Sequence, residues 1–187
     1  NPNLSRVLGT DKQGGLAVYD LQGKQLQYLK VGRLNNVDIR PNFKLGQQKV
    51  DLAIATNRDQ NSLHLFSIHQ KTGQVKDLGK LPTDLQDIYG FCMYQNRQGE
   101  TFAIPNDKNG TFVQYKIQNN AKGLTAHEVL RFKVTSQPEG CVVDDENDRI
   151  YVGEEAKAVW TTKLNDPQHI NLQNVISVGE HVKADVE

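Results

Sequence analysis

Four charged residues, each at the end of a short apolar segment, recur at regular intervals along this chain of 187 residues. They are Lys12, Arg58, Lys108 and Glu155, spaced by 46, 50 and 47 residues. Arginine suits phosphate because its planar guanidinium donates two parallel hydrogen bonds, and lysine adds a compact positive charge. A single charge at a strand end is usually a solvated residue. Three cations in equivalent positions instead predict a site for an anionic ligand, because clustered like charges need a counter-charge.

Carboxylates follow in the second half of the same pattern, at Glu139, Glu154, Glu155, Asp185 and Glu187. Oxygen ligands drawn from several strands are what Ca²⁺ binds, usually six to eight of them. The five histidines are scattered, which argues against zinc. Cations beside carboxylates that hold metal ions suit a phosphate ester, since the metal neutralises charge and activates water. A solvated loop pair remains the alternative for Glu154 and Glu155, and the acidic turn at 144–146 is interpreted as solvated.

The repeat interval also predicts the fold. A period of 46 to 50 residues made of strands is typical of a β-propeller, in which each repeat forms one blade around a central channel. Equivalent positions in successive blades then face one another across the channel. Asn109-Gly110 is a strong hairpin signal because both residues tolerate positive φ. No segment has a sustained helical period. We therefore predict an all-β fold: an incomplete β-propeller with four-stranded antiparallel blades.

The predicted domain organisation is a single partial propeller over residues 1–187. Its blades are expected at 6–32, 34–82, 87–134 and 137–178, with the start of a further inner strand at 182–187. The first blade has three strands and lacks an inner strand. Closed propellers have about four to eight blades, so this arc would expose strand edges. We expect a piece of a longer protein that pairs with the missing blades, and the alternative is an arc that closes through another chain.

The composition excludes some classes of partner. The 22 basic and 22 acidic side chains give no net charge, so there is no case for nucleic acid or a membrane surface. No apolar run approaches the roughly 18 to 20 residues of a spanning helix. Cys92 and Cys141 each follow an inner-strand segment of adjacent blades, where a disulfide is geometrically conceivable. Two small, buried, unpaired cysteines are the favoured interpretation from composition.

Several motifs resemble those of the β-propeller phytases, in order over essentially the whole chain. They are residues 9–16 (GTDKQGGL), 34–40 (LNNVDIR), 56–58 (TNR), 89–91 (YGF), 110–115 (GTFVQY), 139–140 (EG), 151–155 (YVGEE) and 184–187 (ADVE). Those enzymes are six-bladed, calcium-dependent hydrolases that remove phosphates from myo-inositol hexakisphosphate (phytate) through metal-activated water. The resemblance thus implies about four of six blades, a phosphoric monoester hydrolase of the 3-phytase type, Ca²⁺ as cofactor, and secretion to the exterior or periplasm.

The same resemblance implies roles for individual residues. Lys12, Arg58 and Lys108 would bind substrate phosphates, and Tyr89, Glu139 and Glu155 would be catalytic. The implied calcium ligands are Tyr89, Glu139, Glu155, Asp185 and Glu187 at a catalytic cluster, with Asn36, the Val37 carbonyl and Asp38 at a structural calcium.

The chain also departs from the family pattern. Gln13 stands where the family often has a second lysine, and the family's N-terminal Asp-Asp-Pro-Ala segment and its last two blades are missing. The alternative is therefore a non-catalytic module that binds inositol phosphates or assists a larger phytase. A weaker alternative is a propeller of another class, such as a lactonase or an interaction scaffold.

Overall fold

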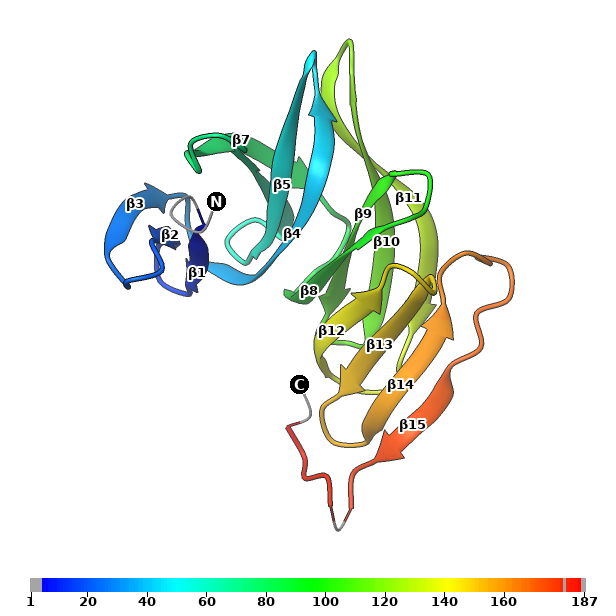
Figure 1. The fold of residues 1–187 in the computed structure, drawn as a ribbon. Coiled ribbons are helices and arrows are strands. Elements are labelled where there is room, and N and C mark those ends of the chain that lie inside the picture. Colours follow the sequence, from blue (N-terminus) through cyan, green and yellow to red (C-terminus); the bar gives the residue numbers. More distant parts are fainter. Residues whose placement is uncertain (1–4, 180, 186–187) are drawn as a thin grey trace.

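The computed structural model describes residues 5–179 and 181–185, and within them the regular secondary structure is entirely β. The strands form four antiparallel sheets that fan out in chain order along an arc (Figure 1). The first sheet has three strands, β1 (Val7–Asp11), β2 (Gly15–Tyr19) and β3 (Gln25–Lys30). The predicted all-β fold is confirmed, and its strand order is that of an incomplete propeller.

Each of the other three sheets has four strands in simple up-and-down order. The second sheet contains β4 (Leu34–Leu45), β5 (Gln48–Asn57), β6 (Ser62–Ile68) and β7 (Val75–Pro82). The third contains β8 (Ile88–Gln95), β9 (Thr101–Asp107), β10 (Thr111–Asn120) and β11 (Gly123–Lys133). The fourth contains β12 (Pro138–Asp144), β13 (Arg149–Glu154), β14 (Ala158–Lys163) and β15 (Gln173–Ser177). Residues 181–185 contain no strand, and the rest of the predicted inner strand at 182–187 lies outside the described residues.

The apolar core lies between neighbouring sheets. Strand β9 is buried along its whole length, and β5 is buried from Leu52 to Asn57. These strands read as near-continuous apolar runs because their sheets are covered on both faces. By contrast, β15 at the edge of the fourth sheet is exposed throughout. The turn predicted at Asn109-Gly110 joins β9 to β10, with Gly110 at φ +96°.

The strands nearest the channel, β4, β8 and β12, lie side by side. Strand β8 contacts β4 on one side and β12 on the other. Each of the three has a register shift near its start, between Leu34 and Val37, Ile88 and Phe91, and Pro138 and Cys141. Such bulges bend a strand and re-aim its side chains, and they are common next to active sites.

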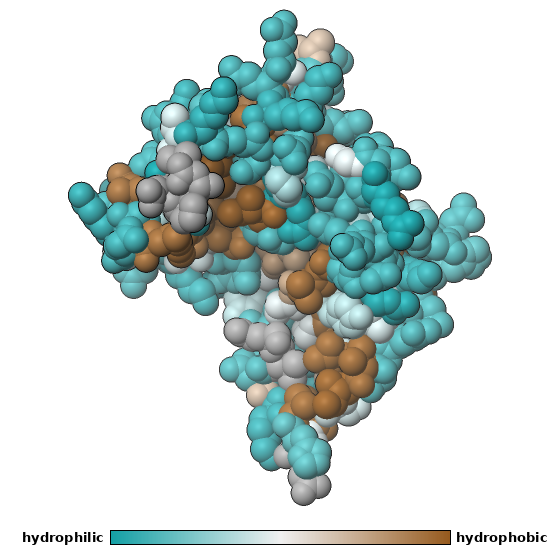
Figure 2. Space-filling view, viewed as in Figure 1, coloured by the Kyte–Doolittle hydropathy of each residue, from teal (hydrophilic) through white to brown (hydrophobic). Residues whose placement is uncertain are grey.

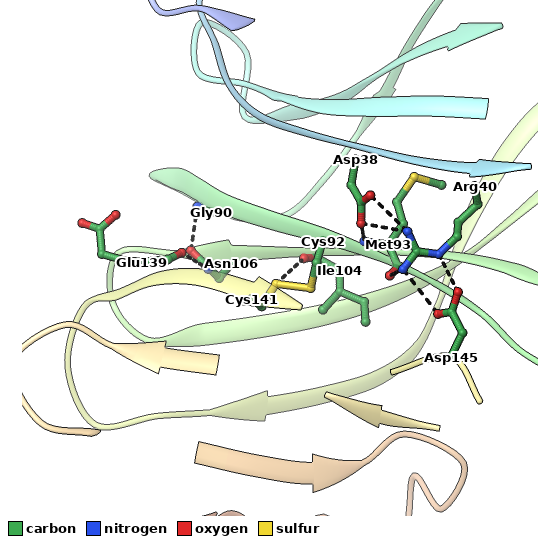
Figure 3. Close-up of a disulfide and its surroundings, with 10 residues drawn as sticks. All are labelled: Asp38, Arg40, Gly90, Cys92, Met93, Ile104, Asn106, Glu139, Cys141 and Asp145. Atoms are coloured by element: carbon green, nitrogen blue, oxygen red, sulfur yellow. Dashed lines mark hydrogen bonds and ion pairs between the residues drawn. A yellow bond between two sulfur atoms is a disulfide. The ribbon is translucent and has the colours of Figure 1, made fainter. Parts of the chain in front are cut away.

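A disulfide joins Cys92 on β8 to Cys141 on β12 (Figure 3). The favoured interpretation of two unpaired cysteines is therefore wrong. The inner strands of adjacent blades bring the two Cα atoms within 5.6 Å, inside the range that a disulfide can span. The bond connects residues 49 apart in sequence and fastens the third sheet to the fourth.

An ion-pair network connects three sheets toward the C-terminal ends of the inner strands β8 and β12 (Figure 3). Arg40 on β4 pairs with Asp38 at 3.0 Å and with Asp145, after β12, at 2.8 Å. Its guanidinium also donates to the carbonyl of Met93 on β8, at 2.5 Å. The sequence predicts that Asp145, in the acidic turn at 144–146, is solvated. That prediction is wrong, because the turn after β12 reaches across β8 and Asp145 forms an ion pair with Arg40 of β4.

Removing the disulfide should lower the stability of the fold. Closing a loop of about 50 residues restricts the unfolded chain, so Cys92→Ala with Cys141→Ala should reduce the free energy of unfolding by about 2 to 4 kcal/mol. Urea unfolding measures this, and a reductant should destabilise the wild-type chain but not the double variant. Free thiols in the unreduced wild-type chain would contradict the disulfide.

The fourth sheet presents an apolar face. In Figure 2 a brown area lies over β12 to β14, where Val142 is 62% exposed. A shallow hollow of about 280 Å³ there is lined by Cys141, Val142, Tyr151 and Val159, among others. Among the described residues, no helix is long and apolar enough to cross a bilayer.

Candidate functional site

The bulges of the inner strands place Tyr89 and Glu139 at equivalent positions in adjacent blades. Tyr89 lies within the register shift of β8 and Glu139 within that of β12. A glycine follows each, and Gly90 has no room for a side chain, because a Cβ there would lie 1.9 Å from the Glu139 carbonyl oxygen. The two strands therefore approach closely at the point where the two side chains meet.

Backbone hydrogen bonds fix three of the four regularly spaced charged residues, Arg58, Lys108 and Glu155 (the ring residues), in equivalent places. Each follows the second strand of a four-stranded sheet, and its N–H donates to the residue just before the inner strand. Arg58 donates to the Arg33 carbonyl at 2.9 Å, and Lys108 to that of Asp87 at 3.2 Å. Glu155 donates to the carbonyl of Gln137 at 3.0 Å. The spacing of 50 and 47 residues in the sequence thus corresponds to one repeated contact.

The two cations converge on Tyr89. The guanidinium carbon of Arg58 lies 5.7 Å from the centre of the Tyr89 ring, and Lys108 Nζ lies 5.2 Å from it. Both separations are within the range of a cation–π contact. Lys108 also pairs with Asp87 at 3.4 Å, and both side chains are partly exposed. Lys12 lies in the turn after β1, where it is exposed.

The Tyr89 hydroxyl donates to Glu139 Oε1 at 3.1 Å. Burial raises the pKa of the Tyr89 phenol, and the neighbouring Glu139 carboxylate raises it further, while Arg58 opposes them. The phenol therefore stays protonated near neutral pH and keeps donating. This hydrogen bond joins the basic side of the site to its acidic side.

Glu139, Glu155 and Asp185 form a carboxylate cluster. One oxygen from each lies within 4.8 Å of the others. Gln137 Nε2 donates to Glu155 Oε2 at 2.7 Å and orients that carboxylate. The Asp185 N–H donates to the Glu155 carbonyl at 2.9 Å, which holds the C-terminal segment beside β13. Glu187 lies outside the described residues.

The donor set of this cluster fits a calcium ion. Calcium–oxygen bonds of about 2.3 to 2.6 Å place two opposite ligands of one ion about 4.6 to 5.2 Å apart. The oxygen separations in the cluster do not exceed this span. Three carboxylates so close repel one another, and a divalent cation between them would relieve the repulsion.

The residues predicted for a second calcium lie together on β4. Asn35 Nδ2 donates to Asn36 Oδ1 at 2.6 Å and to the Tyr89 carbonyl at 3.2 Å, while Asn35 Oδ1 is buried without a hydrogen-bond partner. An unpartnered buried oxygen beside Asn36 and Val37 fits a nearby cation. The Asp38 carboxylate accepts from Arg40 and from the Met93 N–H. Both of its oxygens thus already accept hydrogen bonds, and its role as a ligand stays a prediction.

The structure gives Glu154 another role than that of the metal-binding carboxylate considered from the sequence, and it is not part of the Glu139–Glu155–Asp185 cluster. Glu154 is 1% exposed, and its carboxylate accepts from Thr135, Ser136 and Trp160. It is therefore not part of a solvated loop pair, as the alternative interpretation held. In the preceding blade, buried Asp107 accepts the N–H groups of Gln86 and Asp87. One signal in the sequence could have identified these anchors: Asp107 and Glu154 each immediately precede a ring residue, Lys108 and Glu155.

A separate cleft of about 370 Å³ lies between the third and fourth sheets, at the opposite end of β8. Tyr94, Arg97, Gln114 and Asp148 are among the residues that line it. The Tyr94 hydroxyl donates to Asp148. This cleft shares no residue with the group around Tyr89.

Comparison with known proteins agrees with this geometry. The family model described as Phytase matches residues 1–187. The chain belongs to the phytase family. A 3-phytase of Bacillus subtilis (strain 168) is 37% identical over 198 residues. That alignment covers 100% of this chain and 51% of the relative, so the chain spans about half the length of the curated relative it matches.

A solved structure supports the fold of this member of the phytase family. It is a protein of unknown function from Desulfotomaculum acetoxidans DSM 771, with a TM-score of 0.64 and 16% sequence identity. The match covers 91% of this chain and 50% of the other. At this identity the likeness supports the fold alone.

Proposed function

We propose that this phytase-family chain carries the calcium- and phosphate-binding surface of an enzyme that hydrolyses phosphate monoesters of myo-inositol hexakisphosphate. The observation that carries the proposal is the convergence on Tyr89. Arg58 and Lys108 lie on one side of that side chain, and Glu139 leads to a three-carboxylate cluster on the other. Membership of the phytase family and the related 3-phytase support the reaction class.

The proposed roles follow from the chemistry of each group. Arg58, with two parallel donors, binds one phosphate, and Lys108 exchanges its ion pair with Asp87 for a second phosphate oxygen. Lys12, exposed in the first blade, extends the basic surface for a polyanionic substrate. The Tyr89 phenol holds the Glu139 carboxylate toward the cluster.

Glu139, Glu155 and Asp185 are the proposed ligands of Ca²⁺, with Glu187 as a further expected ligand. When bound, calcium supplies charge neutralisation for the phosphate and activation of the attacking water. Gln137 keeps Glu155 oriented, as outer partners of metal ligands commonly do. The Asn36 and Val37 oxygens, next to the unpartnered Asn35 Oδ1, are the proposed ligands of a structural calcium.

A second candidate function is a binding module without turnover of its own. It is favoured by the 51% coverage of the relative and by the exposed apolar face of the fourth sheet, on which a further blade would pack.

The disulfide supports an oxidising location, extracellular or periplasmic, because such bonds persist there.

Phosphate release from myo-inositol hexakisphosphate tests the two candidates together. The enzyme account predicts release that requires Ca²⁺ and stops when a chelator removes it. Calcium-dependent binding of the hexakisphosphate without release would favour the binding module. Release that continues in the chelator, or neither binding nor release with calcium present, would contradict both.

A further inference from the structure

Two buried polar side chains connect the candidate site to the strands behind it. Thr56 on β5 and Asn106 on β9 are each 0% exposed. Each stands two residues before a ring residue, Arg58 or Lys108. The sequence analysis assigns no role to either residue, and neither touches the surface on which a substrate or metal would bind.

Both side chains reach across to the inner strand of the next blade. Thr56 Oγ1 donates to the Tyr89 carbonyl at 2.8 Å. Asn106 Nδ2 donates to the Glu139 carbonyl at 3.1 Å, and its Oδ1 accepts the Gly90 N–H at 2.9 Å. Figure 3 shows the Asn106 amide between Gly90 and Glu139. The same contact is thus made twice, once to each of the two residues that meet in the site.

These carbonyls need such partners because the strands bulge there, and the Tyr89 carbonyl accepts from Asn35 Nδ2 as well, at 3.2 Å. Tyr89 and Glu139 lie inside the register shifts of β8 and β12, where the regular ladder to the neighbouring strand is interrupted. A buried backbone group without a partner is costly, so the side-chain donors fix the bulged conformation. The bulge in turn sets the direction of the Tyr89 and Glu139 side chains.

We propose that Thr56 and Asn106 are positioning residues, which hold Tyr89 and Glu139 in the orientation that completes the metal-binding carboxylate cluster. The proposal rests on the function proposed above for that cluster. Thr56 acts on Tyr89 from the second blade, and Asn106 acts on Glu139 from the third. The Tyr89–Glu139 hydrogen bond of 3.1 Å joins the two, so loss of either donor loosens the same carboxylate.

Metal affinity of the 187-residue chain tests the proposal without a need for turnover. Thr56→Val keeps the shape of the side chain and removes the donor, and Asn106→Ala removes both of its hydrogen bonds. Asn106→Ala should weaken binding of Ca²⁺, and of Tb³⁺ as a luminescent probe, by about 10- to 100-fold, the usual effect of losing an outer partner of a metal ligand. Thr56→Val should weaken binding in the same direction but less, because Thr56 acts through Tyr89 and Asn35 still donates to the Tyr89 carbonyl. Thr56→Ser retains the hydroxyl donor and should restore most of the affinity.

Thr161→Val is the matched control. Thr161 is also buried, and its hydroxyl donates to the Ile150 carbonyl at 2.8 Å, but on β14, remote from the cluster. The Thr161→Val variant should lower the unfolding temperature about as much as Thr56→Val does, and it should leave the metal affinity unchanged. Equal metal affinity in wild type, Thr56→Val and Asn106→Ala would overturn the inference, as would an equal loss in Thr161→Val.

The outcomes separate this inference from the proposed function. Metal binding by the wild-type chain without phosphate release would count against the hydrolytic function alone, and the affinity differences among variants would still decide the positioning roles. If the wild-type chain bound neither Ca²⁺ nor Tb³⁺, both would be overturned.

Discussion

Glu139→Gln should reduce both the calcium affinity and any calcium-dependent phosphate release by at least about 100-fold. Loss of an outer partner of a metal ligand costs about 10- to 100-fold, and loss of the charge on a ligand itself should reach or exceed the upper end. Glutamine has the shape of glutamate, so the β8–β12 contact can remain. Calorimetric titration and initial rates at saturating Ca²⁺ measure the two effects.

Glu146→Gln is the charge-matched control for this variant. Glu146 is exposed in the turn after β12, at the end of the strand remote from Glu139. The Glu146→Gln variant should retain the wild-type calcium affinity and the wild-type rate of phosphate release. The assignment of Glu139 would be wrong if both variants behaved alike.

Glu154→Ala should destabilise the fold by about 3 kcal/mol or more. Its buried carboxylate accepts from the Thr135 N–H and hydroxyl, from Ser136 and from Trp160 Nε1, and removal would leave these donors unpaired at about 1 to 3 kcal/mol each. Glu155→Ala, one residue away at the cluster, should instead retain stability and lose metal affinity. Urea unfolding of the two variants checks the contrast, and similar stability in both would contradict the anchoring role.

The same anchor predicts a loss of stability in acid. Burial alone would raise the pKa of Glu154, but hydrogen bonds from Thr135, Ser136 and Trp160 outweigh it and lower the pKa from 4.5 to about 2. The folded pKa lies below the unfolded one, so the contribution of about 3 kcal/mol is present above about pH 4.5. It is lost as the pH falls toward 2. In Glu154→Gln the free energy of unfolding, measured by urea unfolding at each pH, should lack this loss between about pH 4.5 and pH 2.

Features that depend on spacing along the chain could be predicted from the sequence. The Asn109-Gly110 hairpin is local, because two residues that tolerate positive φ determine it. The repeat that contains Arg58, Lys108 and Glu155 is also readable, because each blade has similar strand and turn lengths. These features led to the fold and to the positions of the repeated charges, whereas the individual roles of Tyr89, Asn36 and Asp38 came from the resemblance to the family.

Features that depend on contacts between blades could not be predicted. The bulges at Tyr89 and Glu139 depend on how inner strands pair, and no local residue type determines that register. Whether Cys92 and Cys141 bond depends on a distance across two blades. Glu154 and Glu155 are adjacent carboxylates in sequence, yet only the neighbouring Trp160 and Thr135 make one a buried anchor and leave the other for the cluster.

We propose that one surface holds calcium on its carboxylates and phosphate on its cations at the same time. The most direct measurement is calorimetric titration of Ca²⁺ into the chain, with and without myo-inositol hexakisphosphate. We predict saturable calcium binding that tightens when the phosphate ester is present and weakens sharply in Glu139→Gln. Calcium binding that is absent, or that is the same with and without the ester and in Glu139→Gln, would contradict the account.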